Sequence, residues 1–142
     1  MPQNPGMPLR RRADASDGRA VRRILVGTDL SETAQRAVTW AADMARRYEA
    51  ELVLLRVVAP TADSAAAERE LAEHAAGLGA RPVVAVGEDP ADAIVDAVKS
   101  EGADVVVVGS VGMRGRRQFL LGNVPNRVSH AAGCTVVIVD TS

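Results

Sequence analysis

Short apolar runs alternate with longer amphipathic segments along most of this chain. The first run is RILVGTD, residues 23–29, and its short length and final turn residues predict a buried β-strand. In residues 31–48, Ser31 can cap a helix whose apolar positions recur at helical spacing. These positions are Ala34, Val38, Ala41, Ala45 and Tyr48. The first unit is therefore expected to be a strand, a tight turn and a helix.

The same alternation continues along the middle of the chain. AELVLLRVVAP, residues 50–60, predicts a second strand that Pro60 stops. Residues 63–79 predict a second helix that ends at Gly79. The apolar face of this helix is marked by Leu71, Ala75 and Leu78. RPVVAVGED, residues 81–89, then predicts a third strand.

The last part of the chain adds two helices and two strands. Asp89 as an N-cap, with Pro90 in the first turn, begins a third helix that closes at Gly102. Its expected buried residues are Ile94, Val95 and Val98. ADVVVVGS (103–110) predicts the fourth strand and CTVVIVD (134–140) the fifth. Between them, residues 123–132 predict a short helix that Gly133 stops.

Strands that alternate with helices of this length predict parallel pairing through right-handed crossovers. We therefore expect an α/β fold with a single open five-stranded parallel sheet, helices on both faces and the Rossmann-like strand order 3-2-1-4-5. The first and fourth strands are continuous apolar runs, which is typical of central strands covered on both faces. The third strand alternates more and is expected at an edge.

Composition limits the domain count and the class of protein. The chain has 142 residues, enough for one domain, and its 47% hydrophobic but only 2% aromatic residues predict a core of valine, alanine, leucine and isoleucine. Residues 1–20 combine prolines, glycines and arginines, so we expect a flexible basic tail before a domain at 21–142. The net charge of −1 gives no overall attraction to nucleic acid, which is not an expected partner.

Two further features bear on the cellular compartment. The chain has no apolar run of the ~20 residues that span a membrane and no secretory segment, so we expect a cytoplasmic protein without membrane partners. Cys134 is the only cysteine, which excludes an internal disulfide and a cysteine-based zinc cage. We interpret Cys134 as a small buried strand residue rather than a reactive thiol.

The expected strand order places a candidate binding site beyond the first and fourth strands. The winding reverses between these strands, and ligands of open α/β sheets bind beyond the carboxyl ends of strands at such a reversal. Asp29 and Gly109 lie at those two ends. An acidic residue at a strand end is equally typical of a turn, so Asp29 alone leaves both interpretations open.

The loop after the fourth strand favours an anionic ligand. Gly109 and Gly112 would let a ligand approach the backbone closely, and Gly122 precedes a helix whose free amides attract anions. Arg114 could screen phosphate charge. The alternative is a long connection with arginines for solubility. The segment has no Walker lysine motif and no G-x-G-x-x-G, which disfavours a conventional P-loop or dinucleotide site.

A family resemblance rests on these glycines. The spacing G-x-x-G, nine residues, then G with a small polar residue is Gly109, Gly112, Gly122 and Asn123 in this chain. Together with Asp29 in VGTDLSETAQRA and the ending LGNVPNRVSHAAGCTVVIVD, it resembles the ATP-binding signature of the universal stress protein family. The likeness spans about residues 22–140, and it implies a fold of the adenine nucleotide alpha hydrolase type.

The resemblance also implies roles for individual residues. Asp29 would contact the nucleoside, and the backbone near Thr28, Gly109, Ser110 and Gly112 would surround the ligand. Gly122 and Asn123 would lie at the ligand's tail. The family usually has serine or threonine at position 123, and Pro125 removes one amide from the helix's first turn. The resemblance implies ATP, with or without Mg²⁺, as the cofactor, and because of Asn123 and Pro125 the shorter ligands AMP and cyclic AMP stay open.

The fifth strand predicts a protein partner. It is apolar at almost every position although the strand order leaves it at an edge, and a long apolar edge favours pairing with a second chain. The resemblance implies a homodimer formed through this strand. Its residues are Thr135, Val136, Val137, Ile138 and Val139. The alternative is that the tail or a loop covers the edge.

Catalysis is not indicated by the sequence. His74 and His130 are not close in sequence to a serine or cysteine in a nucleophile motif, and we interpret both as surface or packing residues. No catalytic residue and no protein metal site are therefore expected, and at most slow ATP hydrolysis. The leading hypothesis is an adenine-nucleotide-binding stress or signalling module. The alternatives are a dimeric scaffold without nucleotide binding and, least favoured, an enzyme that hydrolyses or transfers adenylate.

Overall fold

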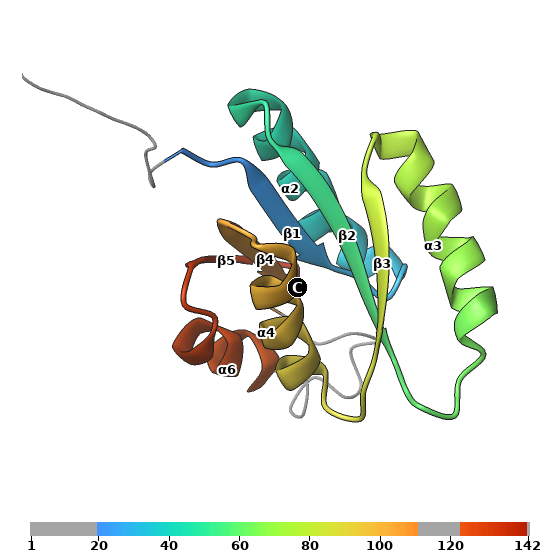
Figure 1. The fold of residues 1–142 in the computed structure, drawn as a ribbon. Helices are drawn as coiled ribbons and strands as arrows, with labels where there is room; N and C mark the ends of the chain where they lie inside the picture. The colour runs from blue at the N-terminus through green and yellow to red at the C-terminus, as the bar shows by residue number, and fades with distance from the viewer. Residues whose placement is uncertain (1–19, 111–122, 142) are drawn as a thin grey trace, which may run out of the picture.

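A computed structural model describes residues 20–110 and 123–141 of this protein, and its core is one parallel sheet between two layers of helices (Figure 1). The elements are β1 (Arg23–Gly27), α2 (Glu32–Tyr48), β2 (Glu51–Val58), α3 (Ser64–Leu78), β3 (Arg81–Val86), α4 (Pro90–Glu101), β4 (Val105–Gly109), α6 (Asn123–Ala131) and β5 (Thr135–Val139). The five strands follow the order β3-β2-β1-β4-β5. The predicted α/β fold and strand order are confirmed. The expected tail at 1–20 lies outside the described residues except for residue 20.

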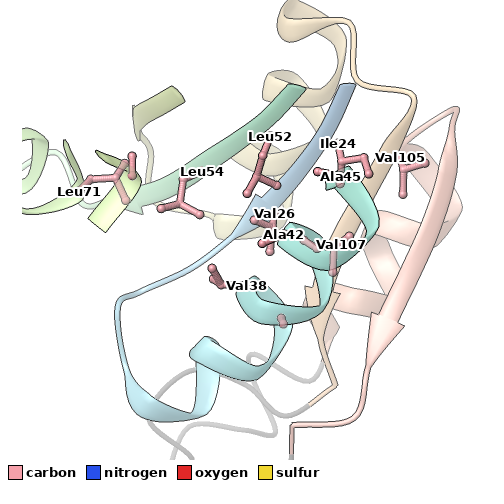
Figure 2. Close-up of a cluster of buried hydrophobic side chains, with 13 residues drawn as sticks. Ile24, Val26, Val38, Ala42, Ala45, Leu52, Leu54, Leu71, Val105 and Val107 are labelled. Atoms are coloured by element: carbon pink, nitrogen blue, oxygen red, sulfur yellow. The ribbon is translucent and has the colours of Figure 1, made fainter. Parts of the chain in front are cut away.

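Each face of the sheet is covered by two helices, because alternate strand residues point to opposite sides. Ile24, Leu54 and Val107 belong to a buried cluster with residues of α2 and α3. Figure 2 shows part of this cluster, with Val38, Ala42 and Ala45 of α2 facing the central strands. The intervening residues, such as Leu25 and Val106, pack with α4 and α6 in a second cluster. Both faces of β1 and β4 are therefore apolar, which explains their continuous hydrophobic runs.

The helices begin where short polar side chains can cap them. Ser31 Oγ accepts a hydrogen bond from the Ala34 amide at 3.1 Å, and Asp63 Oδ1 accepts one from Ala66 at 3.1 Å. Asp89 accepts hydrogen bonds from two amides at the start of α4. The N-caps predicted at Ser31 and Asp89 are therefore confirmed, and Asp63 is a further cap that was not predicted.

Three details of the expected burial are different in the structure. Tyr48 is the last residue of α2 and is 51% exposed. Ala37 and Ala42 of the same helix are buried instead. Leu78 and Val95 are only half-buried. Cys134 is half-buried and lies one residue before β5, so it is not a buried strand residue. Burial raises the pKa of its thiol, which favours the unreactive protonated form.

Charged side chains form a network at the amino-terminal ends of the strands. Glu51 accepts hydrogen bonds from Arg23 Nε at 2.6 Å and from Arg81 Nε at 2.8 Å, and Arg81 also pairs with Glu101 at 2.7 Å. The hydrogen bond from Arg81 is the main cause that lowers the pKa of Glu51, and Arg23 adds to it. This network joins β1, β2, β3 and α4 at the end of the sheet opposite to the candidate site.

No helix in the described residues is long and apolar enough to cross a lipid bilayer.

Candidate functional site

The candidate site begins where the adjacent strands β1 and β4 separate. Their pairing runs to Val26 opposite Val107, and β4 continues to Gly109, which pairs with Val139 of β5. After β1 the chain enters α2 on one face of the sheet, whereas the helix after β4 lies on the other face (Figure 1). The carboxyl ends of these strands therefore form the reversal at which open α/β sheets bind ligands.

Residues 28–31 form a tight turn at the end of β1, which we call the 28–31 turn. Thr28 is 2% exposed, and its amide donates to the carbonyl of Leu55 at 2.9 Å. Thr28 Oγ1 accepts from the Leu30 amide at 2.9 Å, and Asp29 Oδ1 accepts from the Ser31 amide at 2.9 Å. In both hydrogen bonds the acceptor side chain lies two residues before the donor amide, which is common in turns. The bond from Ser31 orients the Asp29 carboxylate.

Leu30 has an unusual backbone conformation within this turn. Its φ is +67°, which only a few per cent of non-glycine residues adopt. The hydrogen bonds at the two neighbouring residues hold this conformation, and such strained residues cluster at ligand sites and switches. Asp29 therefore has a structural role in the turn, which was one of its two sequence interpretations.

Gly109 and Ser110 lie at the end of β4, where they contact the end of the chain. The Ser110 amide donates to the Val139 carbonyl at 2.7 Å, and Ser110 Oγ accepts from the Thr141 amide at 3.1 Å. A Cβ at Gly109 would lie 3.0 Å from Thr141 Cγ2, tighter than most packed carbon contacts, so Thr141 would have to shift to accommodate it. The packing of Thr141 is therefore a reason for glycine at this position that the sequence did not reveal.

Thr141 is a residue of this region that sequence reasoning missed. It is 4% exposed, although polar residues this near a chain end are usually solvated. No sequence signal marks it, because its neighbours Gly109 and Ser110 lie about thirty residues earlier and meet it only when β5 pairs with β4.

The remaining predicted residues belong to the loop between β4 and α6. Gly112, Arg114 and Gly122 lie outside the described residues. Asn123 is the first residue of α6, as the sequence predicted. Val124 and Val128 are buried in the cluster shared with α4, so the first turns of α6 are held against α4.

A charged contact joins the same two helices. Arg127 Nη1 donates to both carboxylate oxygens of Asp89, at 3.0 and 2.9 Å, and its Nη2 donates to Asp92 Oδ1 at 2.9 Å. This contact raises the pKa of Arg127, and it is the main cause that lowers the pKa of Asp89. Asp89 was predicted only as a cap of α4. Its second role, which fixes α6 beside the start of α4, follows from tertiary packing.

The two histidines lie on α3 and α6. His74 is exposed, and its Nδ1 donates to the carbonyl of Glu70 at 3.0 Å. In residues 20–110 and 123–141, no three His, Cys, Asp or Glu side chains are grouped so that they could hold a metal ion. The site as described thus offers an oriented carboxylate and two hydroxyls, which are groups suited to hydrogen bonding with a polar ligand.

Comparison with known proteins identifies relatives along most of the chain. The profile of the "Universal stress protein family" matches residues 20–76 and 62–140. Universal stress protein Rv1636 of Mycobacterium tuberculosis strain H37Rv is 32% identical over 148 residues, which cover 87% of this chain and 99% of the relative.

Two solved structures illustrate the structural likeness. A universal stress protein in complex with cAMP is 35% identical, with a TM-score of 0.69, and the match covers 87% of this chain and 99% of that chain. The universal stress protein from Archaeoglobus fulgidus in complex with dAMP is 24% identical, with a TM-score of 0.62, over 84% of this chain and 98% of that chain. The second likeness concerns the fold alone.

Proposed function

This chain belongs to the universal stress protein family, and from that premise we propose that it is a cytoplasmic stress or signalling module that binds an adenine nucleotide beyond β1 and β4. The observation that carries the proposal is the 28–31 turn, which holds the Asp29 carboxylate at the point where these strands separate. Further support comes from the 35% identical relative whose structure contains cAMP.

Asp29 is assigned to the nucleoside. The Ser31 amide holds the Asp29 carboxylate at the carboxyl end of β1, and a carboxylate accepts hydrogen bonds of the kind that ribose hydroxyls donate. Acidic residues bind ribose hydroxyls in this way in other α/β nucleotide sites. Thr28 and Ser110 would contribute backbone groups beside the ligand.

The phosphates are assigned to the glycine loop and the start of α6. In this proposal Gly109 and Gly112 line the phosphate chain, Arg114 screens its charge, and Gly122 and Asn123 bind its end. Amides at a helix N-terminus favour anions, which supports this orientation. ATP, with or without Mg²⁺, is the first ligand proposed, and AMP and cyclic AMP are the alternatives because of Asn123 and Pro125.

Calorimetric titration of the full chain tests the proposal. ATP, AMP and cyclic AMP are titrated separately, with and without Mg²⁺, and GTP serves as the control for the base. We expect saturable heat with at least one adenine nucleotide and weaker binding of GTP. The absence of heat from all three adenine ligands at millimolar concentration would contradict the proposal.

The exposed edge of the sheet favours a second candidate, a dimeric scaffold. In the described part of the chain β5 pairs with β4 alone, and Ile138 on β5 is 48% exposed. An open groove of about 610 Å³ lies beside β5, between Val139 and the partly exposed Trp40 of α2. We propose that two copies associate through β5, because an apolar edge strand is stabilised by a partner. Dimerisation without nucleotide binding would favour the scaffold.

A further inference from the structure

A cavity of about 310 Å³ lies between α2 and α3, and it shares Thr28 with the proposed nucleotide site. Val38 of α2 and Leu54 of β2 line it, and both belong to the buried cluster beneath α2 and α3 (Figure 2). The helix α6, at whose start the phosphates are proposed to bind, packs on the opposite face of the sheet. The cavity has a volume at the lower end of the ~300–1,000 Å³ typical of small-molecule sites.

Gly77 of α3 lines one side of the cavity, and packing does not require a glycine at this position. A Cβ added at Gly77, inside α3, would meet no atom within 4 Å. Glycine is disfavoured inside a helix relative to alanine, so helix propensity does not account for it. The missing side chain leaves room between α3 and the apolar residues Val38 and Leu54.

The strained residue Leu30 also lines this cavity. Its φ of +67° is held by the hydrogen bond from its own amide to Thr28 Oγ1, and Thr28 is a second lining residue. Backbone strain of this kind is more frequent at ligand sites than elsewhere. Leu30 and Leu78 add to the mainly apolar wall of the cavity.

The polar residues of the cavity select the charge of a ligand. Glu73 and His74 lie on α3, and the carboxylate of Glu73 only accepts hydrogen bonds when ionised. Nδ1 of His74 donates to the Glu70 carbonyl, so Nε2 is an acceptor in the neutral ring. Among the described residues that line the cavity, none is lysine or arginine. These groups suit a hydrogen-bond donor or a cation and disfavour an anion.

We propose that the cavity between α2 and α3 binds a small amphipathic amine, with its apolar body against Val38 and Leu54 and its ammonium group beside Glu73 and His74. The apolar body has about the size of one aromatic ring. This ligand differs in charge from a nucleotide, so the two sites take different classes of molecule.

The full chain, labelled with ¹⁵N, is titrated with 2-phenylethylamine and, separately, with 3-phenylpropionate, which has the same ring but a carboxylate. We expect saturable shifts of amide signals in α2 and α3 with the amine, and affinity for the carboxylate at least about 10-fold lower, the effect of one charge-assisted contact. Equal binding of the two ligands, or no saturable shift in these helices, would overturn the proposal.

Variants at Gly77 test whether the amine occupies the cavity. Gly77→Leu would fill the space and abolish amine binding, and the matched Gly77→Ala would keep affinity within about 3-fold, because one methyl group leaves most of the volume. A Gly77→Leu variant that is folded and binds as the wild type refutes the site. Glu73→Gln provides a test that does not depend on packing, with an expected loss of about 5-fold, typical of an exposed charge pair. Unchanged affinity in this variant also counts against the proposal.

Discussion

At the residue scale, the 28–31 turn shows how short polar side chains determine backbone geometry. Thr28 and Asp29 each accept a hydrogen bond from the amide two residues further along, and between them they hold Leu30 at a positive φ. Ser31 then caps α2. Because the turn depends on side-chain oxygens rather than on charge, its structure and its proposed binding role can be separated by substitution.

Asp29→Asn makes this separation. The amide oxygen of asparagine can still accept from Ser31, so we expect the fold to be retained, while the loss of charge lowers affinity for the adenine nucleotide by about 10- to 100-fold. Glu88→Gln, which removes an exposed carboxylate at the same end of the sheet, is the matched control. Calorimetric titration measures both variants. Equal effects of the two substitutions would show that Asp29 has only its structural role.

Gly109→Ala tests the contact with Thr141. The new Cβ would lie 3.0 Å from Thr141 Cγ2, so we expect the free energy of unfolding to fall by about 1–3 kcal/mol, typical of overpacking. In the double variant with Thr141→Ala the clash is largely removed, so the double variant should be more stable than the sum of the single effects predicts. Urea unfolding measures all three variants. Additive effects would mean that the two residues do not interact.

At the scale of elements, a charged contact and apolar packing together join α6 to α4. Arg127 lies in α6 and bonds both Asp89 and Asp92. Val124 and Val128 of the same helix are buried in the apolar cluster that α6 shares with α4 and the sheet. Apolar packing thus fixes the distance of α6 from the sheet, and the charged contact fixes its position along α4.

Arg127→Gln should lower the urea midpoint of unfolding at neutral pH, with a smaller effect at high salt because the pair is partly exposed. The folded state lowers the pKa of Asp89 below its usual 3.8. The stabilisation is therefore present above pH 3.8 and is lost as the pH falls through the lower folded pKa. The difference between wild type and variant should then disappear in acid. Arg69→Gln, in the exposed face of α3, is the control; an equal loss in this variant would contradict the assignment.

At the scale of the whole molecule, the sheet has two edge strands with different surroundings. Val86 of β3 is 57% exposed and Ile138 of β5 is 48% exposed, so each edge presents an apolar side chain. Only β5 also lies beside the open groove that Trp40 lines. This difference is the structural reason for assigning the proposed dimer to β5.

Ile138→Lys and Val86→Lys form a matched pair that tests the dimer. A lysine in an edge strand opposes pairing with a second chain, so we expect Ile138→Lys to be monomeric at micromolar concentration. Wild type and Val86→Lys should remain dimers. Sedimentation velocity measures the three masses. A monomeric wild type, or dissociation by both substitutions, would refute pairing through β5.

The sequence by itself determined the elements and their order. Caps such as Ser31 and Asp89 act within a few residues, and the apolar period of a segment indicates which of its faces is buried, so both can be read along the chain even though single residues such as Tyr48 are exposed. The strand order also followed, because right-handed crossovers and the apolar runs of β1 and β4 leave few alternatives. The same reasoning placed Asp29 and Gly109 at the carboxyl ends of adjacent strands.

Only the tertiary structure decided which side chains meet across these elements. Residues far apart in sequence meet in the packing of Thr141 on Gly109 and in the bonds from Arg127 to Asp89. The cavity beside Gly77 likewise lies between elements that are distant in the chain. No local pattern encodes such contacts, because they depend on the distances at which helices and strands pack. A periodic pattern specifies which face of an element is buried, whereas the shape of the space between two buried faces is set by both of them together.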